Sequence, residues 1–406
     1  MRTFADIPDV TGPDGTAAGW RVRRRELLDQ FARTEYGRRP DIDYALSSRT
    51  LRETAIDGLG AGGATGRVVE LTVATVLGSY SFPLYVFIPR AAEPVPAHVL
   101  ICSQNRQVAP FRMPDGMKPE DIPAMMARLG VIMDAPLPMP HPRPLDMEHD
   151  MDNGHWPVPA LMDRGHAVVG FYATDVEADD ARAFPSGLAR IFGTAPADGP
   201  GRKPDEWGVL SVWAFAASLA LDWALGEPAI DPGNIGVIGH SRCGKAALWA
   251  GANDERFRCV TPNNSGCCGA ALSRGKHGEN LKSITMMFPH WFAPGFAAYA
   301  DDPYALPFDQ HQLLACVAPR LLYVTSASED LWSDPAGEHE ATVRASAAWG
   351  LYGYPALPPT MPEPDEPVSA GPVGYHVRRG AHLLTEYDWM RVVDHMERNR
   401  DARTEP

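Results

Sequence analysis

Hydrophobic residues along the chain form short runs that alternate with segments of helical periodicity. Two apolar runs within residues 66–89 are separated by a turn and predict an antiparallel pair of strands. Further strand-like runs occupy residues 97–104, 166–175, 235–240, 258–266 and 319–330. Helix-like patterns lie between or after the later strands, at about 207–226, 242–253, 336–350 and 384–398. This alternation predicts an α/β fold in three layers, with a mainly parallel central sheet covered by helices on both faces.

Long irregular segments rich in Pro, Gly and Asp interrupt the pattern. They occupy residues 106–155, 176–205, 267–310 and 351–375. In a compact α/β domain such insertions usually lie over the active site, so we expect loops that roof it. No internal repeat is evident. We expect a single domain over residues 1–406, with a helical or extended N-terminal segment at about residues 1–60.

Composition narrows the class of partner. The chain has 406 residues, 45% of them hydrophobic, and a formal net charge of -14. This charge repels nucleic acids and anionic membranes, so a small-molecule or oligosaccharide substrate is expected instead. The apolar segment 209–225 has helical periodicity and predicts a buried helix rather than a membrane span. The first residues lack the pattern of a signal peptide, which leaves open a cytoplasmic enzyme or the sequence of a processed, secreted form.

The cysteines and histidines give no metal-binding pattern. The six cysteines include no C-x-x-C pair and lie in or beside apolar segments, so we expect reduced, packed thiols; they are Cys102, Cys243, Cys259, Cys267, Cys268 and Cys316. The histidine-rich stretch at 139–155 lacks fixed ligand spacing and contains several prolines, so it predicts a polar surface insertion. We expect no metal and no organic cofactor.

The stretch IGVIGHSRCGKAALWAGA at residues 235–252 is compatible with two chemistries. The residues from Gly239 to Lys245 have the spacing of a phosphate-binding P-loop. The first three of these, G-H-S, also begin a nucleophile elbow centred on Ser241. A P-loop needs a Ser or Thr after the lysine to hold Mg²⁺, and that position is Ala246. The P-loop is therefore the weaker interpretation.

An elbow requires an acid and then a histidine further along the chain. Asp330 ends the strand-like run at 319–330, and His382 immediately precedes the last amphipathic helix. The order Ser, Asp, His is that of the α/β-hydrolases. The sequence therefore predicts a Ser-His-Asp triad made of Ser241, His382 and Asp330.

The elbow departs from the usual G-x-S-x-G, because Cys243 stands at its last position and Gly244 follows. G-H-S-R-x-G-K followed by ALWAGANDERF resembles the glucuronoyl esterases of carbohydrate esterase family 15, particularly their bacterial branch. The resemblance extends over roughly residues 165–395, and weakly to RTEYGRRP near residue 33. Its other blocks are RGHAVVGFYATDVEADD, WGVLSVWAFAASLALDW, NNSGCCGAALSR, FPHWF, LPFDQHQLLACVAPRLLYVTSASEDLWSDPAGE and GAHLLTEYDW.

The resemblance implies an α/β-hydrolase fold and a role for each matching residue. Ser241 is the nucleophile and His382 the general base. Arg242 follows the serine, so its backbone N–H is expected to donate to the oxyanion, with help from its side chain. Lys245 and Trp332 match positions that hold the uronic acid ring. The alternatives are a solvated surface lysine and a tryptophan that only packs a loop.

The acid of the triad is the point at which the sequence departs from much of the family. Many bacterial members carry a glutamate at the second position of N-E-S-G, and here that position is Asn264, whose amide carries no charge. The other acid position of the family is occupied by Asp330. We therefore assign the acid to Asp330, treat Asn264 as a hydrogen-bonding spectator, and expect the adjacent Glu329 to point away. The alternative is that Asp330 only caps the following helix.

Two histidines and one loop carry weaker predictions. His290 in FPHWF is assigned to substrate binding, with a packed, hydrogen-bonded core histidine as the alternative. His240 is expected to pack under the elbow. Residues 101–107 follow the strand from which a hydrolase supplies its second oxyanion donor, but they contain no HGGG-type motif.

The resulting prediction is a serine esterase, a carboxylic ester hydrolase that cleaves esters of uronic acids. The resemblance implies the 4-O-methyl-glucuronoyl ester that links xylan to lignin alcohols in lignocellulose. One alternative is a deacetylase or methyl-esterase acting on a small sugar acid or natural product. The alternative of another class is a carbohydrate-binding pseudoenzyme. We expect a monomer that binds neither nucleic acid nor membrane.

Overall fold

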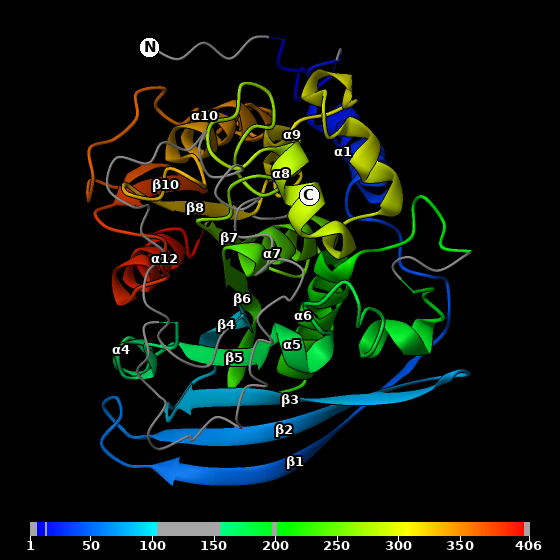
Figure 1. Ribbon diagram of the computed structural model, residues 1–406. Helices are drawn as coiled ribbons and strands as arrows, with labels where there is room; N and C mark the ends of the chain where they lie inside the picture. Colours follow the sequence, from blue (N-terminus) through cyan, green and yellow to red (C-terminus); the bar gives the residue numbers. More distant parts are fainter. Residues whose placement is uncertain (1–5, 13, 104–154, 197–200, 402–406) are drawn as a thin grey trace.

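One mixed sheet runs through the protein. The structure is a computed structural model that describes residues 6–12, 14–103, 155–196 and 201–401. In the described residues the strands follow the order β1-β2-β3-β5-β4-β6-β7-β8-β10-β9 (Figure 1). Their bounds are β1 Ala45–Ile56, β2 Ala64–Thr75, β3 Gly78–Pro89, β4 Val95–Cys102, β5 Ala167–Tyr172, β6 Ile230–His240, β7 Cys259–Asn263, β8 Leu321–Ala327, β9 Val368–Ala370 and β10 Val373–Arg378.

The centre of this sheet is parallel and its edges are antiparallel. β5, β4, β6, β7, β8 and β10 pair in parallel, in that spatial order. β1, β2 and β3 form an antiparallel meander that joins β5, and β9 closes the other edge against β10. The predicted antiparallel pair and the parallel centre are confirmed.

Three strands were absent from the prediction. β1, with the sequence ALSSRTLRETAI, is mostly exposed and lacks an apolar alternation because it lies at the sheet edge. β9 is only three residues long. β10 is fully buried but includes His376 and Arg378, so its sequence does not read as an apolar run.

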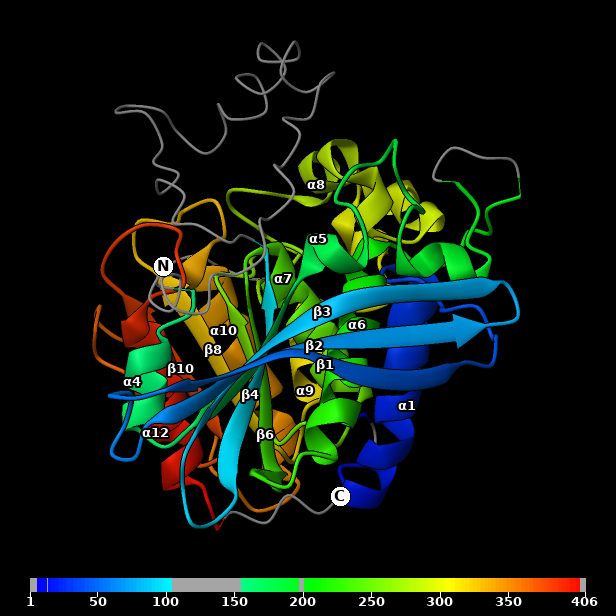
Figure 2. The same ribbon diagram turned by 90° about the horizontal axis from the view of Figure 1, so that it is seen from below.

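Helices cover both faces of the sheet (Figure 2). They are α1 Ala17–Thr34, α4 Val158–Asp163, α5 Ala173–Val176, α6 Val209–Leu225, α7 Arg242–Asn253, α8 Leu281–Met287, α9 Gln310–Ala315, α10 Pro335–Ala345, α11 Ala347–Gly350 and α12 Glu386–Arg398. The predicted helices at 207–226, 242–253 and 384–398 are confirmed. The helix expected at 336–350 is two helices that meet at Ser346.

Two hydrophobic cores lie on the two faces. Successive residues of β4 alternate between them, so Val99 and Ile101 face the core built with α1, α6, α7 and α10, whereas Leu100 faces the core built with α4 and α12. α6 is buried along most of its length. None of the helices in the described residues is long and apolar enough to cross a membrane.

All six cysteines are free and buried, as expected. Of the irregular segments, 267–310 contains α8 and three short 3₁₀-helices at Pro289–Trp291, Pro294–Tyr299 and Pro303–Ala305. The segment 176–205 contains another, at Leu188–Phe192. The segment 106–154 lies outside the described residues.

Candidate active site

The predicted catalytic residues follow the carboxyl ends of neighbouring strands. Ser241 comes directly after β6, Asn264 directly after β7, Asp330 shortly after β8 and His382 shortly after β10. Because these strands are parallel and adjacent, their carboxyl ends lie at one edge of the sheet. This edge is where ligands bind in open α/β sheets.

The turn at Ser241 has the backbone of a nucleophile elbow. Ser241 has φ 57° and ψ -123°, a conformation that a non-glycine residue adopts only when its surroundings hold it. Its N–H donates to the carbonyl of Asn263 at 2.9 Å. A Cβ atom at Gly239 would lie 2.2 Å from the Cys243 carbonyl oxygen, and one at Gly244 would lie 2.9 Å from that of Asn263. The close backbone approaches therefore require glycine at 239 and 244, while Cys243 is buried in the core.

His382 lies beside this elbow and is bound to Asp330. Its Nδ1 atom is 2.6 Å from Oδ2 of Asp330. Its ring centroid is 4.4 Å from that of His240, the residue before the serine. Burial alone would raise the pKa of the Asp330 carboxyl, but the charge and hydrogen bond of His382 and the bonds from Ser333 lower it below its usual value. Asp330 is thus held as the carboxylate that an imidazolium needs.

The residue that caps the helix after Asp330 is not Asp330 but Asp334. Asp334 is the N-cap of α10 and accepts from the N–H of Gly337 at 3.1 Å. Glu329 is exposed, and its direction away from His382 stays a prediction.

Asn264 does not contact the His382 ring through a hydrogen bond. Its Nδ2 donates to the carbonyl oxygen of Leu383, the next residue along the chain from His382, at 3.0 Å. Asn264 has φ 43°, a left-handed conformation that asparagine adopts more readily than most residues. It supports the histidine loop rather than the imidazole itself.

The Arg242 side chain is held by a buried carboxylate. It forms an ion pair with Asp179, which lies in the segment after α5. Oδ1 of Asp179 also accepts from Trp291 Nε1 at 2.6 Å and lies 2.9 Å from His290 Nε2. The Arg242 guanidinium lies over the Trp291 and Phe288 rings, 4.8 and 5.2 Å from their centroids.

These contacts explain why the buried Asp179 carboxyl has a lowered pKa, and they place His290 beside Asp179. Burial would raise the pKa of the Asp179 carboxyl, but the Arg242 charge and the hydrogen bonds of His290 and Trp291 lower it well below its usual value. His290 is buried and reaches Arg242 through Asp179. Its assignment to substrate binding stays a prediction.

Lys245 is buried one helical turn after the serine. Its Nζ donates to the Ser265 carbonyl at 2.6 Å and lies 3.9 Å from Oε2 of Glu279. The Glu279 N–H donates to the carbonyl of Trp332 at 3.0 Å, which ties the loop of Trp332 to this pair. Lys245 is therefore not a solvated surface lysine. Its contact with a sugar, like that of the half-buried Trp332, stays a prediction.

Two residues of the site, Asp179 and Glu279, were not predicted from the sequence. Asp179 is one of two adjacent aspartates in DVEADD, and nothing in that pattern separates it from Asp180. Glu279 lies in the irregular segment 267–310, where no periodicity assigns a direction to a side chain. Both come from insertions, whose positions depend on tertiary packing.

Two predicted features lie largely outside the described residues. The loop 101–107 is described only up to Ser103, and the histidine-rich stretch 139–155 only at His155. His155 is buried with its ring centroid 5.3 Å from that of His240. In the part of the chain that the structure describes, no group of three or more His, Cys, Asp or Glu is arranged to hold a metal ion.

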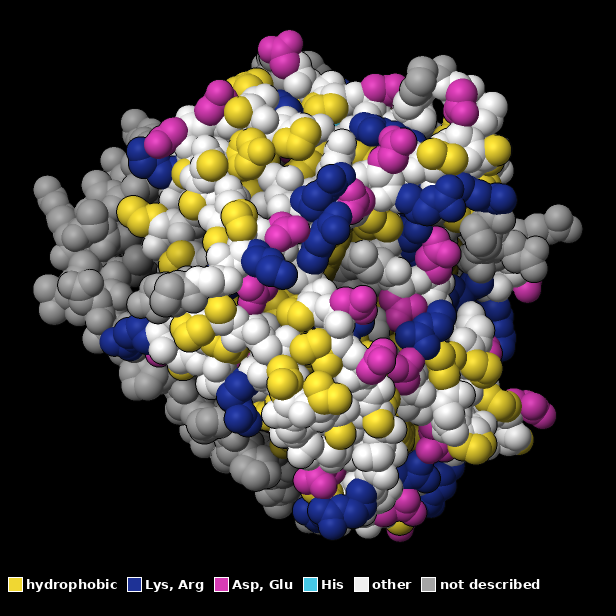
Figure 3. Space-filling view, turned by 90° about the vertical axis from the view of Figure 1, so that its right-hand side faces the viewer, with side chains coloured by type: hydrophobic (Ala, Val, Ile, Leu, Met, Phe, Trp, Pro, Cys, Tyr) yellow, Lys and Arg dark blue, Asp and Glu magenta, His cyan; other side chains and the backbone are white. Residues whose placement is uncertain are grey.

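Two cavities of about 500 and 740 Å³ lie on a different face, beside α1 and the last residues of α7. Figure 3 looks onto the side on which α1 lies, and Lys and Arg side chains gather near its centre. The lining of the larger cavity includes Arg21, Arg24, Arg25, Arg39 and Arg256. Asn253, the last residue of α7, lines both cavities. Ser241 stands at the other end of α7, just before its first residue. The cavities and the elbow are therefore at opposite ends of this helix.

Two curated proteins with related sequences are named as esterases. A family model described as fungal glucuronyl esterase matches residues 202–353. Carbohydrate esterase MZ0003, from an unknown prokaryotic organism, is 40% identical over 242 residues, which are 58% of this chain and 54% of that protein. The 4-O-methyl-glucuronoyl methylesterase 1 of Sodiomyces alcalophilus is 34% identical over 155 residues, 36% of this chain and 31% of that protein. The chain thus spans about half, or less, of the length of these relatives.

A solved structure extends the similarity to the whole chain. A glucuronoyl esterase from Solibacter usitatus matches with a TM-score of 0.78 and 30% identity, covering 98% of this chain and 99% of that one. The predicted α/β-hydrolase fold is confirmed by this match. Since the identity extends over nearly the full length of both proteins, the chain belongs to the glucuronoyl esterases of carbohydrate esterase family 15.

Proposed function

We propose that this protein is a serine esterase that hydrolyses esters of uronic acids through Ser241, His382 and Asp330. The observation that carries the proposal is the 2.6 Å contact between His382 Nδ1 and the buried, ionised Asp330, next to the strained turn of Ser241. A carboxylate on Nδ1 fixes the tautomer that leaves Nε2 free to take a proton.

Each half of the reaction uses the same groups. His382 Nε2 removes the proton of Ser241 Oγ as the oxygen attacks the ester carbonyl. Collapse of the tetrahedral intermediate expels the alcohol, which takes the proton from His382 and leaves the acyl group on Ser241. Water, activated by His382, then releases the uronic acid. Asp330 stabilises the imidazolium in both steps.

Arg242 supplies the developing oxyanion with donors. It is the first residue of α7, so its N–H has no partner within the helix and is directed outward at the helix N-terminus. Its guanidinium adds a positive charge whose direction is fixed by Asp179. A fixed charge stabilises a transition state better than a mobile one, because little reorganisation is needed as the oxyanion forms.

The uronic acid assignment is supported by the relatives and by the polar groups near the elbow. One curated relative is named a 4-O-methyl-glucuronoyl methylesterase, and the full-length structural relative is named a glucuronoyl esterase. Lys245, one helical turn from Ser241, and its partner Glu279 provide a buried ammonium and carboxylate, a combination that suits sugar hydroxyls. Trp332 would line the same pocket. The linkage between xylan and lignin is the corresponding natural ester.

A substrate panel tests the proposal. Benzyl and methyl glucuronate esters, galacturonate esters and aryl acetates are compared by kcat/KM, with Ser241→Ala as the control for background hydrolysis. We expect the highest kcat/KM on glucuronate esters. Preference for aryl acetates would instead indicate a deacetylase. Absence of both turnover and Ser241 labelling by a fluorophosphonate in folded protein would indicate a binding protein.

A further inference from the structure

The loop that carries His382 is held by a buried arginine at the end of β10. The Nη2 atom of Arg378 donates to the carbonyl oxygens of Ala381, at 2.8 Å, and Leu383. These residues are the immediate neighbours of His382 on its two sides. One guanidinium nitrogen therefore fixes the backbone immediately before and after the predicted general base.

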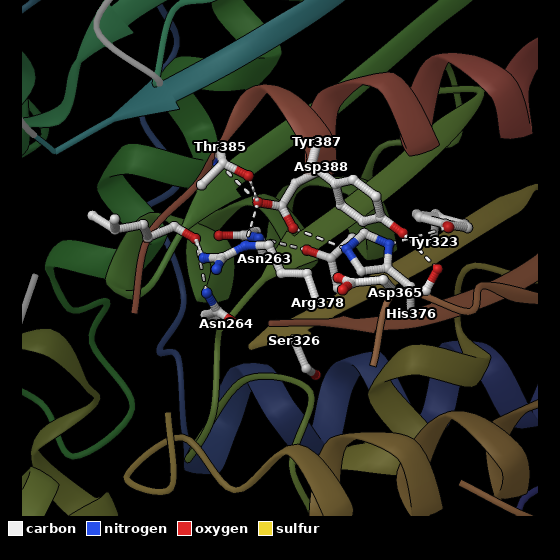
Figure 4. A network of polar contacts seen from close by, with 12 residues as sticks. Asn263, Asn264, Tyr323, Ser326, Asp365, His376, Arg378, Thr385, Tyr387 and Asp388 are labelled. Atoms are coloured by element: carbon white, nitrogen blue, oxygen red, sulfur yellow. Dashed lines mark hydrogen bonds and ion pairs between the residues drawn. The ribbon is translucent and has the colours of Figure 1, made fainter. Parts of the chain in front are cut away.

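Asp388, in the first turn of α12, orients this arginine (Figure 4). Its Oδ2 accepts from Arg378 Nε at 2.9 Å, and also from the N–H and hydroxyl of Thr385 at 2.8 and 2.7 Å. Its Oδ1 lies 2.9 Å from His376 Nε2. Asp388 and His376 are fully buried, and Arg378 is nearly so. A charge-assisted bond in such a site is short and directional.

The ionised state of Asp388 is consistent with these bonds. Burial would raise the pKa of its carboxyl, but the His376 hydrogen bond, the Arg378 charge and Thr385 lower it below its usual value. His376 Nδ1 lies 3.1 Å from the hydroxyl of Tyr323. Each ring nitrogen of His376 therefore has a polar partner, Tyr323 on one side and Asp388 on the other.

Asn264 donates to one of the same carbonyl groups, that of Leu383. Its Nδ2 lies 3.0 Å from the Leu383 oxygen that Arg378 also binds. The two donors, one after β7 and one at the end of β10, therefore converge on one atom of the histidine loop.

The imidazole has few other restraints. His382 lies in irregular chain between β10 and α12, and its side chain is 24% exposed. Its polar restraint from the described side chains is the single bond to Asp330. Alignment of Nε2 with Ser241 therefore depends on the backbone of residues 381–383.

We propose that Arg378, oriented by Asp388, is a positioning residue for catalysis that holds His382 in line with Asp330 and Ser241. This inference rests on the proposed esterase mechanism. A purely structural role would concern α12, but that helix has its own cap in Thr385 and Asp388. The Arg378 donors go to the loop instead.

The test measures the rate at which a fluorophosphonate labels Ser241, because that step needs His382 but no particular sugar. Arg378→Lys keeps the positive charge but cannot reproduce the planar fork of donors. The matched control is Arg320→Lys, since Arg320 is also buried and donates to the carbonyls of Asp254 and Phe257, far from His382 along the chain. Unfolding midpoints are recorded for both.

We expect Arg378→Lys to slow labelling by roughly 10- to 100-fold, as misplacement of a catalytic group does. Arg320→Lys should leave the rate unchanged at a comparable loss of stability. Equal rates for Arg378→Lys and wild type, or equal slowing in the control, would overturn the inference. A wild type that is not labelled at all would instead contradict the proposed esterase function.

Steady-state kinetics provide a readout that instability alone does not move. The kcat and KM values of both lysine variants are compared with those of wild type on a glucuronate ester. Because Arg378 bonds to the backbone on both sides of His382, Arg378→Lys should lower kcat and leave KM unchanged. An unchanged kcat, or a change confined to KM, would contradict the inference.

If Arg378→Lys does not fold, the same measurements on Asp388→Asn test the inference. This variant keeps the size of the side chain and removes the charge that orients Arg378. Slower labelling and a lower kcat at unchanged KM are expected, and wild-type values of both would overturn the inference.

Discussion

His382 and Asp330 meet because β8 and β10 are adjacent parallel strands that end together. The register pairs Ala327 with Arg378, the last residue of each strand. Asp330 follows three residues later and His382 four residues later, and their side chains close to 2.6 Å. An acid placed after β8 can therefore serve the histidine without a glutamate after β7.

Replacing this acid should expose its contribution. Asp330→Asn should lower kcat by about 10²- to 10⁴-fold, because the neutral amide neither stabilises the imidazolium nor fixes its tautomer. The measurement is kcat on a glucuronate ester, with the unfolding midpoint as a check of folding. A value within about threefold of wild type would show that another carboxylate is the acid.

The complementary exchange concerns Asn264. In the Asp330→Asn background, Asn264→Glu should restore part of the lost kcat by returning a carboxylate to the second acid position. In the wild-type background the same change should lower the unfolding midpoint, since it removes the bond to Leu383 and places glutamate at φ 43°. Activity of the double variant no higher than that of Asp330→Asn would mean that residue 264 cannot reach the imidazole.

The nucleophile allows the simplest test. Ser241→Ala should lower kcat by at least ~10³-fold with the fold intact, because members of a triad act as a unit. Steady-state kinetics and a thermal unfolding curve of the same preparation provide the check. Turnover retained by a well-folded variant would place the nucleophile elsewhere.

The Arg242 side chain should act mainly on kcat. Arg242→Ala keeps the backbone donor but removes the guanidinium, with an expected loss of ~10²-fold or more. Asp179→Asn leaves the arginine in place without the carboxylate that directs it, so a smaller loss in the same direction is expected. A change confined to KM in both variants would make Arg242 a substrate-binding residue.

The order of catalytic residues could be predicted from the sequence because it depends on strand ends. Buried strands such as β4 and β8 are mostly apolar runs; Ser241 directly follows β6, and Asp330 lies three residues after the end of β8. His382 was predicted from the helix after it, although the strand before it was not recognised. The side chains of His376 and Arg378 on β10 are buried. Asp388 on α12 bonds to both and so offsets the cost of burying these polar groups.

The surroundings of the triad depend on contacts distant in the sequence. Asp179 is 63 residues from Arg242, and Asn264 is 119 residues from Leu383. No local period connects such pairs, so the sequence indicated the candidate triad but not the residues that hold it.

A buried glutamate behind the site provides a test of stability. Glu338 lies on α10, fully buried, and its carboxyl accepts from Ser326 Oγ at 2.6 Å and from the Gly266 N–H at 2.8 Å. Burial, as the largest cause, raises its pKa to about 7, which hydrogen bonds from Ser326 and Gly266 oppose. The folded protein therefore holds the Glu338 proton more tightly than the unfolded chain does.

The sign of the pH dependence follows from that raised pKa. The stability that the Glu338 proton contributes is complete below pH 4.5, declines as the pH rises, and is lost above about pH 7, an effect on the order of 3 kcal/mol. Glu338→Gln cannot ionise and should gain in unfolding midpoint relative to wild type between pH 5 and pH 8. Thermal unfolding at both pH values measures this difference, with Glu340→Gln on the same helix as the control, because Glu340 is partly exposed. A difference between Glu338→Gln and wild type that stays constant with pH would show that Glu338 does not titrate in this range.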